Sequence, residues 1–139
     1  MKKSFVLALV LAMLLLLCAC SSGPKEEVTF QNDLEVKLHS IYISPVTDED
    51  WTEPLNYAAL SSGSSIHIAF EKFAGDSAYY DIGVVDENGM NYDAYDVVLS
   101  IGDTLALSGS LDAATLTVTA ADGSQKTYDA FVYDPADFE

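Results

Sequence analysis

The chain has 139 residues and is strongly acidic, with 22 Asp and Glu against six Lys, no Arg and a formal net charge of −16. This length suits one domain. Because so negative a surface repels phosphate backbones and anionic lipid headgroups, the composition excludes nucleic-acid binding and purely electrostatic attachment to membranes. Half of the residues are hydrophobic, which indicates a chain with a folded core.

The N-terminus has the pattern of a secretory signal. Lys2 and Lys3 precede an uninterrupted apolar run over residues 5–17. The run is shorter than the roughly 20 residues that a helix needs to cross a bilayer, and it matches the hydrophobic region of a signal peptide. An ordinary cleaved signal or an N-terminal membrane helix stays open as the simpler alternative.

The end of this run, Leu17-Cys18-Ala19-Cys20, resembles the lipobox of bacterial lipoproteins. Leu17 stands three positions before Cys20, and the small Ala19 directly precedes it. Cys18 fits poorly, because the bulky Leu17 would then occupy the small-residue position. The resemblance implies cleavage before Cys20 and a diacylglycerol thioether on its sulfur. It also implies a domain held on the extracytoplasmic side of a bacterial cell membrane.

Lipidation of Cys20 would have two consequences. Two or more acyl chains, at about 0.8 kcal/mol per buried methylene, anchor a protein stably, where one chain would not. The lipid would also occupy the one cysteine of the mature chain, so the folded domain should contain no disulfide.

The expected organisation is a lipoprotein signal peptide over residues 1–19, a flexible tether over 20–27 and a β domain over 28–139. The tether is indicated by Ser, Gly and Pro followed by charge in SSGPKEE. After cleavage, four lysines stand against the 22 acidic residues, so the mature charge is near −18.

Short alternating runs between turn residues predict seven or eight strands and almost no helix. In SIHIAF, for example, Ile66, Ile68 and Phe70 should point inward and His67 outward. In EVKLHSIYIS the apolar phase changes near 39–40, which calls for a β-bulge. The clearest predicted strands cover residues 35–44, 65–70, 79–85, 91–100, 104–107, 115–120 and 127–133.

Two hairpins are predicted at Asn88-Gly89 and Asp122-Gly123, since these dipeptides tolerate positive φ. The longest irregular stretch covers residues 47–65, with a helical turn expected around 54–60. We therefore expect an all-β, antiparallel two-sheet sandwich, immunoglobulin-like in the broad sense.

A second resemblance covers most of the mature chain. It is carried by Asn32, by the strand Ile41-Tyr42-Ile43-Ser44-Pro45 with Trp51, Leu55 and Gly63 after it, and by Tyr80-Asp81-Ile82. These residues resemble a group of small, uncharacterised secreted bacterial β-sandwich domains. Thr52 stands where that group has a glycine. The resemblance implies fold and export and carries no activity.

Catalysis is not expected. The two histidines, His39 and His67, lie in separate predicted strands, and no glycine pattern typical of a nucleophile elbow surrounds any serine. Pairs of carboxylates carry no weight in a chain with this many. The absence of Arg removes the bidentate clamp that anionic substrates often need.

Two acidic segments contain candidate ligand-binding residues. Trp51 lies in the acidic loop TDEDWTE, where it either packs over one end of the domain or contacts a ligand, since exposed aromatics stack on sugars and form protein hot spots. In DENGMNYD, the oxygen ligands of Asp86, Asn88 and Asp93 suit calcium, without the EF-hand spacing. Two distant histidines are too few for zinc.

The sequence thus predicts a lipid-anchored extracytoplasmic domain with a non-catalytic role in binding an extracellular glycan or protein. A calcium-dependent structural module is the alternative, and an enzyme comes third. No cofactor is expected apart from the calcium of that alternative.

Overall fold

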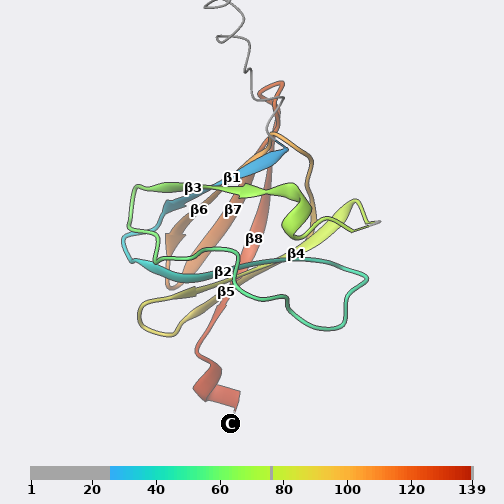
Figure 1. The fold of residues 1–139 in the computed structure, drawn as a ribbon. Coiled ribbons are helices and arrows are strands. Elements are labelled where there is room, and N and C mark those ends of the chain that lie inside the picture. Colours follow the sequence, from blue (N-terminus) through green and yellow to red (C-terminus); the bar gives the residue numbers. More distant parts are fainter. Residues whose placement is uncertain (1–25, 76, 139) are drawn as a thin grey trace, which may run out of the picture.

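The computed structural model describes residues 26–75 and 77–138, so the predicted signal peptide, Cys20 and most of the tether lie outside the described residues. The described residues are all-β, as predicted, and no helix among them is long and apolar enough to cross a membrane. The strands are β1 (Glu27–Asp33), β2 (Leu38–Pro45), β3 (Ser65–Ala69), β4 (Tyr79–Asp86), β5 (Asn91–Val98), β6 (Thr104–Ser110), β7 (Ala113–Thr119) and β8 (Gln125–Tyr133). Two short 3-10 helices, η1 (Phe70–Lys72) and η2 (Pro135–Phe138), complete the elements (Figure 1).

The strands form one curled sheet in the order β2-β4-β5-β8-β7-β6-β1-β3. The curled sheet has two facing halves. In Figure 1 the half that contains β1 and β3 lies above the half that contains β2, β4 and β5, and β8 runs from one half to the other. The halves are continuous because the long β8 pairs with β7 through residues 125–130 and with β5 through residues 131–133. The predicted antiparallel arrangement is wrong at one pair, since β1 and β6 run parallel.

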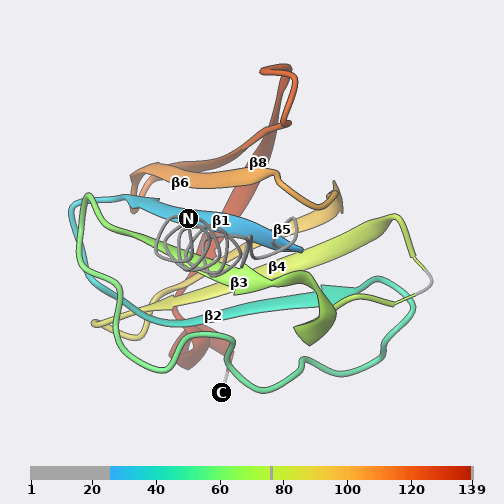
Figure 2. The same cartoon turned by 45° about the horizontal axis from the view of Figure 1, so that its top comes forward.

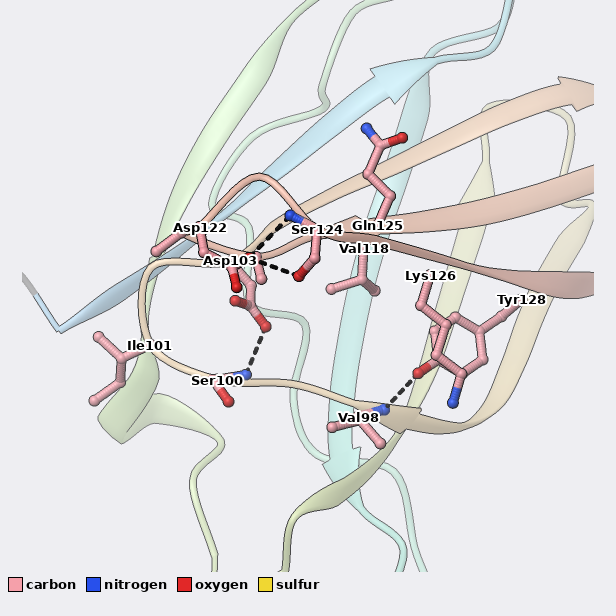
Figure 3. A pocket seen from close by; sticks show the side chains of 12 residues that line it. Val98, Ser100, Ile101, Asp103, Val118, Asp122, Ser124, Gln125, Lys126 and Tyr128 are labelled. Atoms are coloured by element: carbon pink, nitrogen blue, oxygen red, sulfur yellow. Dashed lines mark hydrogen bonds between the residues drawn. The ribbon is translucent and has the colours of Figure 1, made fainter.

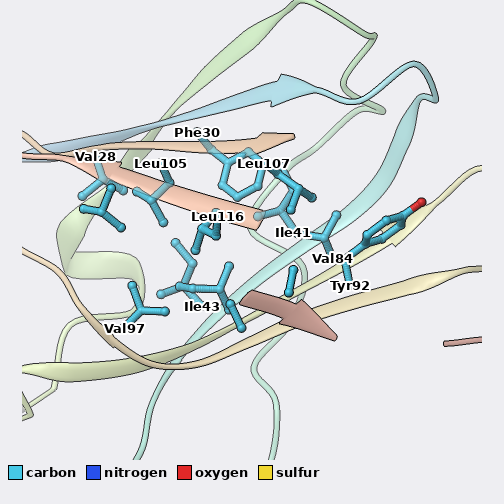
Figure 4. Close-up of a cluster of buried hydrophobic side chains, with 14 of the residues drawn as sticks. Val28, Phe30, Ile41, Ile43, Val84, Tyr92, Val97, Leu105, Leu107 and Leu116 are labelled. Carbon is cyan, nitrogen blue, oxygen red and sulfur yellow. The ribbon is translucent and has the colours of Figure 1, made fainter. Parts of the chain in front are cut away.

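The core lies between the facing halves of the curled sheet (Figure 4). Val28, Phe30 and Leu105 from one half meet Ile41 and Ile43 from the other, and all five are fully buried. Burying each such side chain contributes roughly 1.5–3 kcal/mol, before the entropy cost of ordering it. The inward alternation predicted for 66–70 and 80–84 is confirmed, with Tyr80, Ile82 and Val84 buried and His67 exposed.

The predicted bulge and hairpins are confirmed. The pairing of β2 with β4 shifts register between Leu38 and Ser40, which lets Leu38 and Ile41 both face the core. Asn88-Gly89 joins β4 to β5, and Asp122-Gly123 joins β7 to β8. Gly89 and Gly123 have φ of +84° and +86°, which glycine adopts without steric cost.

The predicted helical turn around 54–60 is wrong. Residues 46–64 instead run along the outer edge of β2 (Figure 2). In the backbone, Leu55 N donates to Ile41 O at 2.8 Å, and Leu38 and Leu60 exchange two hydrogen bonds. The buried side chain of Asn56 accepts from Ile41 N at 2.8 Å and donates to His39 O at 2.9 Å. An edge strand offers unpaired backbone groups, so it holds this irregular segment against itself and is covered by it.

Candidate binding site on the outer face of β2, β4, β5 and β8

One row of residues crosses the outer face of four strands. The strand registers pair Tyr42 with Gly83, Gly83 with Asp93 and Asp93 with Phe131. Residues paired in this way point to the same side of a sheet, and their chain neighbours point to the other. Because those neighbours include buried Ile41, Ile82, Val84 and Tyr92, the row faces away from the core.

Trp51 lies on this row rather than over one end of the domain. A Cβ atom built on Gly83 would lie 3.1 Å from Cη2 of Trp51, so the indole is in contact with the glycine backbone. The Trp51 ring centroid is 6.1 Å from that of Tyr42. The side chain nevertheless keeps 45% of its surface exposed. Trp51 is therefore both held by the sheet and available to a ligand.

Asp93 is the charged group of the row and is only 5% exposed. Its Oδ2 accepts hydrogen bonds from the Tyr133 hydroxyl at 2.9 Å and the Tyr95 hydroxyl at 3.1 Å. Burial raises the pKa of Asp93, the hydrogen bonds from Tyr133 and Tyr95 oppose this rise, and the charge of Asp81 adds to it. A buried carboxylate with a perturbed pKa beside a cavity is a candidate functional group.

A cavity of about 260 Å³ opens beside this carboxylate. The cavity is smaller than the roughly 300–1,000 Å³ of sites that hold drug-sized ligands, so it suits one small group. Its charged lining residue is Asp93, and the other lining residues are Tyr42, Trp51, Gly83, Val84, Val85, Asn91 and Tyr133.

Further aromatic side chains extend the site along the same side. The ring of Tyr133 lies 5.4 Å from that of Phe131 and 5.6 Å from that of Phe138, and Phe131, Phe138 and Tyr95 are exposed. We call the set formed by Tyr42, Trp51, Tyr95, Phe131, Tyr133 and Phe138, with Asp93 among them, the aromatic face.

The structure does not bring the predicted calcium ligands together. Asp86 shares the inner side of the sheet with Tyr92, whose hydroxyl donates to its Oδ2 at 3.2 Å, while its Oδ1 accepts from the backbone of Asn88 and Met90 at 2.8 and 3.0 Å. Asp93 points to the opposite side, because it follows Tyr92 directly in β5. Across residues 26–75 and 77–138, no three His, Cys, Asp or Glu side chains form a group that could hold a metal ion.

The histidines do not form a catalytic constellation in the described part of the chain. His39 Nδ1 lies 2.9 Å from Ser40 Oγ, and His67 Nδ1 lies 3.1 Å from Thr29 Oγ1. A working nucleophile also needs a third group that orients the base. No described carboxylate contacts either imidazole within hydrogen-bond distance, and both histidines are exposed.

A larger cavity, about 460 Å³, lies between the loop after β5 and the β7–β8 hairpin (Figure 3). Its polar groups serve the surrounding turns. Asp103 Oδ2 accepts from Ser100 N at 2.8 Å, Asp122 Oδ1 accepts from both the backbone and the hydroxyl of Ser124, and the Tyr128 hydroxyl accepts from Val98 N at 3.0 Å. Each of these groups thus holds a turn in place, and Tyr128 is the one aromatic residue among those that line this cavity, so the aromatic face is the better candidate.

Sequence reasoning singled out Trp51 and Asp93 but assigned them to separate roles, and it missed Gly83, Tyr42 and Tyr133. One signal was available for Gly83. A glycine within the otherwise bulky strand YYDIGVVD is unfavourable unless another group approaches the backbone closely. Nothing local indicates that the approaching group is a tryptophan 32 positions earlier, at Trp51.

Comparison with known proteins adds little. No protein-family model matches the chain, and the search of curated proteins gives no significant match. Among solved structures, the chain is similar to the NMR structure of a protein from Eubacterium rectale, with 14% sequence identity, a TM-score of 0.43, and coverage of 84% of this chain and 94% of that one. A likeness this distant supports no functional argument.

Proposed function

We propose that the protein is a lipid-anchored, extracytoplasmic binding domain without catalytic activity, and that its aromatic face binds an extracellular glycan. The observation that carries the proposal is the half-exposed Trp51 indole held beside the Asp93 carboxylate in a small cavity. The aliphatic C–H face of a sugar ring packs against an aromatic ring, and its hydroxyl groups donate to carboxylate oxygens.

The glycan proposal is supported by how rigidly the site is held. The row is built on four paired strands, and sites on such elements are more precise than sites on loops. Two tyrosine hydroxyls fix the orientation of the Asp93 carboxylate, so little side-chain entropy would be lost on binding.

Trp51 fluorescence tests this proposal, because Trp51 is the one tryptophan of the chain. The full-length protein in nanodiscs of zwitterionic lipid is titrated with oligosaccharides of different sugar composition. At least one should change Trp51 emission with saturation and give calorimetric heat. The heat should vanish in Trp51→Ala and persist in Tyr57→Ala, which removes a side chain that is 96% exposed and outside the aromatic face. A response only to protein partners would contradict the glycan proposal.

Anchoring is supported by the lipobox pattern ending at Cys20 and by the Ser- and Gly-containing tether that follows it. In the proposed arrangement, lipid on Cys20 holds the domain to the membrane and residues 20–27 let it reach its ligand. Cys20→Ala should abolish labelling by a clickable fatty acid and leave the precursor uncleaved, while Cys18→Ala should be processed normally. Normal lipidation of Cys20→Ala would overturn this arrangement.

We also propose that the fold is immunoglobulin-like in the broad sense. Its support is the single core shared by two facing halves of the sheet. An experimental structure in which the halves pack at about 30° would agree with it, and one in which the strands cross near 90° would not.

A further inference from the structure

The structure points to the chemical class of ligand that the aromatic face selects. We propose that this face recognises an ammonium group and that, within the glycan class, its ligands are de-N-acetylated amino sugars. The choice of a sugar as the carrier of the ammonium group rests on the proposed function above. The ammonium group itself is argued from the cavity.

The first argument is the free acceptor in the cavity. Asp93 Oδ2 already accepts from two tyrosines, whereas Oδ1 accepts no hydrogen bond from the described residues. Among the described residues, Thr52 Oγ1 is the one fully buried side-chain N or O atom without a partner, so Asp93 Oδ1, which also has none, is not fully buried. It offers a charged acceptor to a donor that enters the cavity, and charge-assisted hydrogen bonds are about twice as strong as neutral ones.

The second argument is the wall around this acceptor. The rings of Tyr42, Trp51 and Tyr133 line the cavity with Asp93. The faces of aromatic rings carry partial negative charge and attract cations, most strongly where water is excluded. A carboxylate together with three aromatic rings therefore favours an organic cation over a neutral group of equal size.

The third argument is the charge around the site. None of the lysines in the described part of the chain lines the cavity: Lys126 Nζ lies 4.7 Å above the Tyr128 ring, Lys72 lines two different grooves, and Lys37 is exposed in the segment between β1 and β2. Asp81, close enough to raise the pKa of Asp93, adds negative charge on the same side. This negative charge disfavours uronic acids and phosphorylated glycans. N-acetyl sugars carry no positive charge for the site to attract.

The test compares matched ligands on the full-length protein in zwitterionic nanodiscs at physiological salt. Calorimetry and Trp51 fluorescence are used to titrate a glucosamine tetramer, the N-acetylglucosamine tetramer, a neutral cellotetraose and choline chloride. We expect the glucosamine tetramer to bind at least tenfold more tightly than its N-acetylated counterpart. We also expect choline chloride to compete with it beyond the effect of an equal concentration of sodium chloride.

Two variants separate the site from the net charge of the protein. Asp93→Asn keeps the size of the side chain and should abolish the tenfold preference. Asp112→Asn removes the same unit of charge from an exposed turn between β6 and β7 and should keep the preference. If Asp93→Asn does not fold, competition by choline on the unaltered protein still decides whether an ammonium group is recognised.

The outcomes of the two proposals are distinguishable. Equal binding of the two tetramers, or an unchanged preference in Asp93→Asn, would overturn the ammonium inference and leave the glycan proposal standing. Binding of choline without either tetramer would support ammonium recognition and overturn the glycan proposal. If no ligand of the panel binds, the assignment of de-N-acetylated amino sugars is overturned together with the recognition of choline-type cations.

Discussion

The Trp51 indole lies against the backbone of Gly83, on the outer face of β4. A Cβ atom at position 83 would lie 3.1 to 3.3 Å from three indole carbons, which is closer than ordinary van der Waals contact. The absence of a side chain at Gly83 thus sets the depth at which Trp51 lies and the width of the cavity beside Asp93.

Replacing Gly83 by Val should displace the indole without unfolding the domain. Valine favours strand conformation, which offsets part of the lost contact, so we expect the free energy of unfolding to change by less than about 1 kcal/mol. Trp51 emission should shift to the red, and glycan binding should be lost. Ala106→Val, at an outward position of β6, is the control and should leave Trp51 emission unchanged. Wild-type emission in Gly83→Val would contradict the contact between Trp51 and Gly83.

The contact between the segment 46–64 and the edge of β2 depends on Asn56. Replacing it by Ala removes the acceptor for Ile41 N and the donor to His39 O and Ala58 O. Leaving buried backbone groups unpaired costs about 1–3 kcal/mol each, so we expect a loss of about 2–4 kcal/mol in the free energy of unfolding by urea. The neighbouring Tyr57→Ala should change it by less than about 0.5 kcal/mol. Equal effects of the two substitutions would show that the edge contacts do not matter.

Mild acidification should stabilise the domain. Burial raises the pKa values of Asp93 and Asp103 above the ordinary 3.8, so folding disfavours their charged forms. Stability is then lowest well above the folded-state pKa and rises as the pH falls through it towards the unfolded-state value. Asp122, whose pKa is lowered by hydrogen bonds from Ser124, acts in the opposite sense, but it is fully exposed.

Urea unfolding at pH 7.5 and at about pH 4.5, just above the ordinary 3.8, measures this effect, and the midpoint should be higher at the lower pH. The difference between the two midpoints should shrink in Asp93→Asn, which has no charge to lose. A midpoint that falls on acidification would mean that stabilised carboxylates outweigh Asp93 and Asp103.

Alkali should destabilise the domain through its tyrosines. Burial and the charge of Asp86 raise the pKa of Tyr92 from 10.0 to about 12, and burial and Asp93 do the same for Tyr95. The unfolded chain therefore releases these protons first, and stability present below pH 10 is lost as the pH rises towards 12. Near-ultraviolet absorbance should show tyrosinate forming together with unfolding, and Tyr92→Phe should make stability less steeply dependent on pH. Complete tyrosine ionisation in a folded domain would refute the assignment.

Calcium should act on this domain only through ionic strength. Both carboxylate oxygens of Asp86 are already hydrogen-bonded, and Asp93 lies on the other side of the sheet. Millimolar calcium and magnesium should therefore raise the melting temperature equally, by screening the repulsion of a chain near −18. A rise with calcium well beyond that with magnesium would restore the calcium-dependent structural module as the better account.

Local rules within the sequence were sufficient for seven of the eight strands and for their turns, whereas β1 lies in none of the predicted strands. Alternation identified the inward Tyr80, Ile82 and Val84, because successive residues of a strand face opposite sides. The phase change before Ile41 predicted the bulge, and Asn88-Gly89 and Asp122-Gly123 predicted the hairpins. Each of these features depends on residues within a few positions of one another, so no knowledge of distant pairing was needed.

Distant pairing decided the rest. The parallel contact of β1 with β6 and the division of β8 between two neighbours depend on which strands meet, and alternation is the same for every such choice. The irregular path of residues 54–60 arises from hydrogen bonds to the unpaired edge of β2, which override their local preference for a helical turn. The candidate site also depends on distant pairing. The registers of four strands bring Tyr42, Gly83, Asp93 and Phe131 into one row. The segment that runs along the edge of β2 places Trp51 against that row.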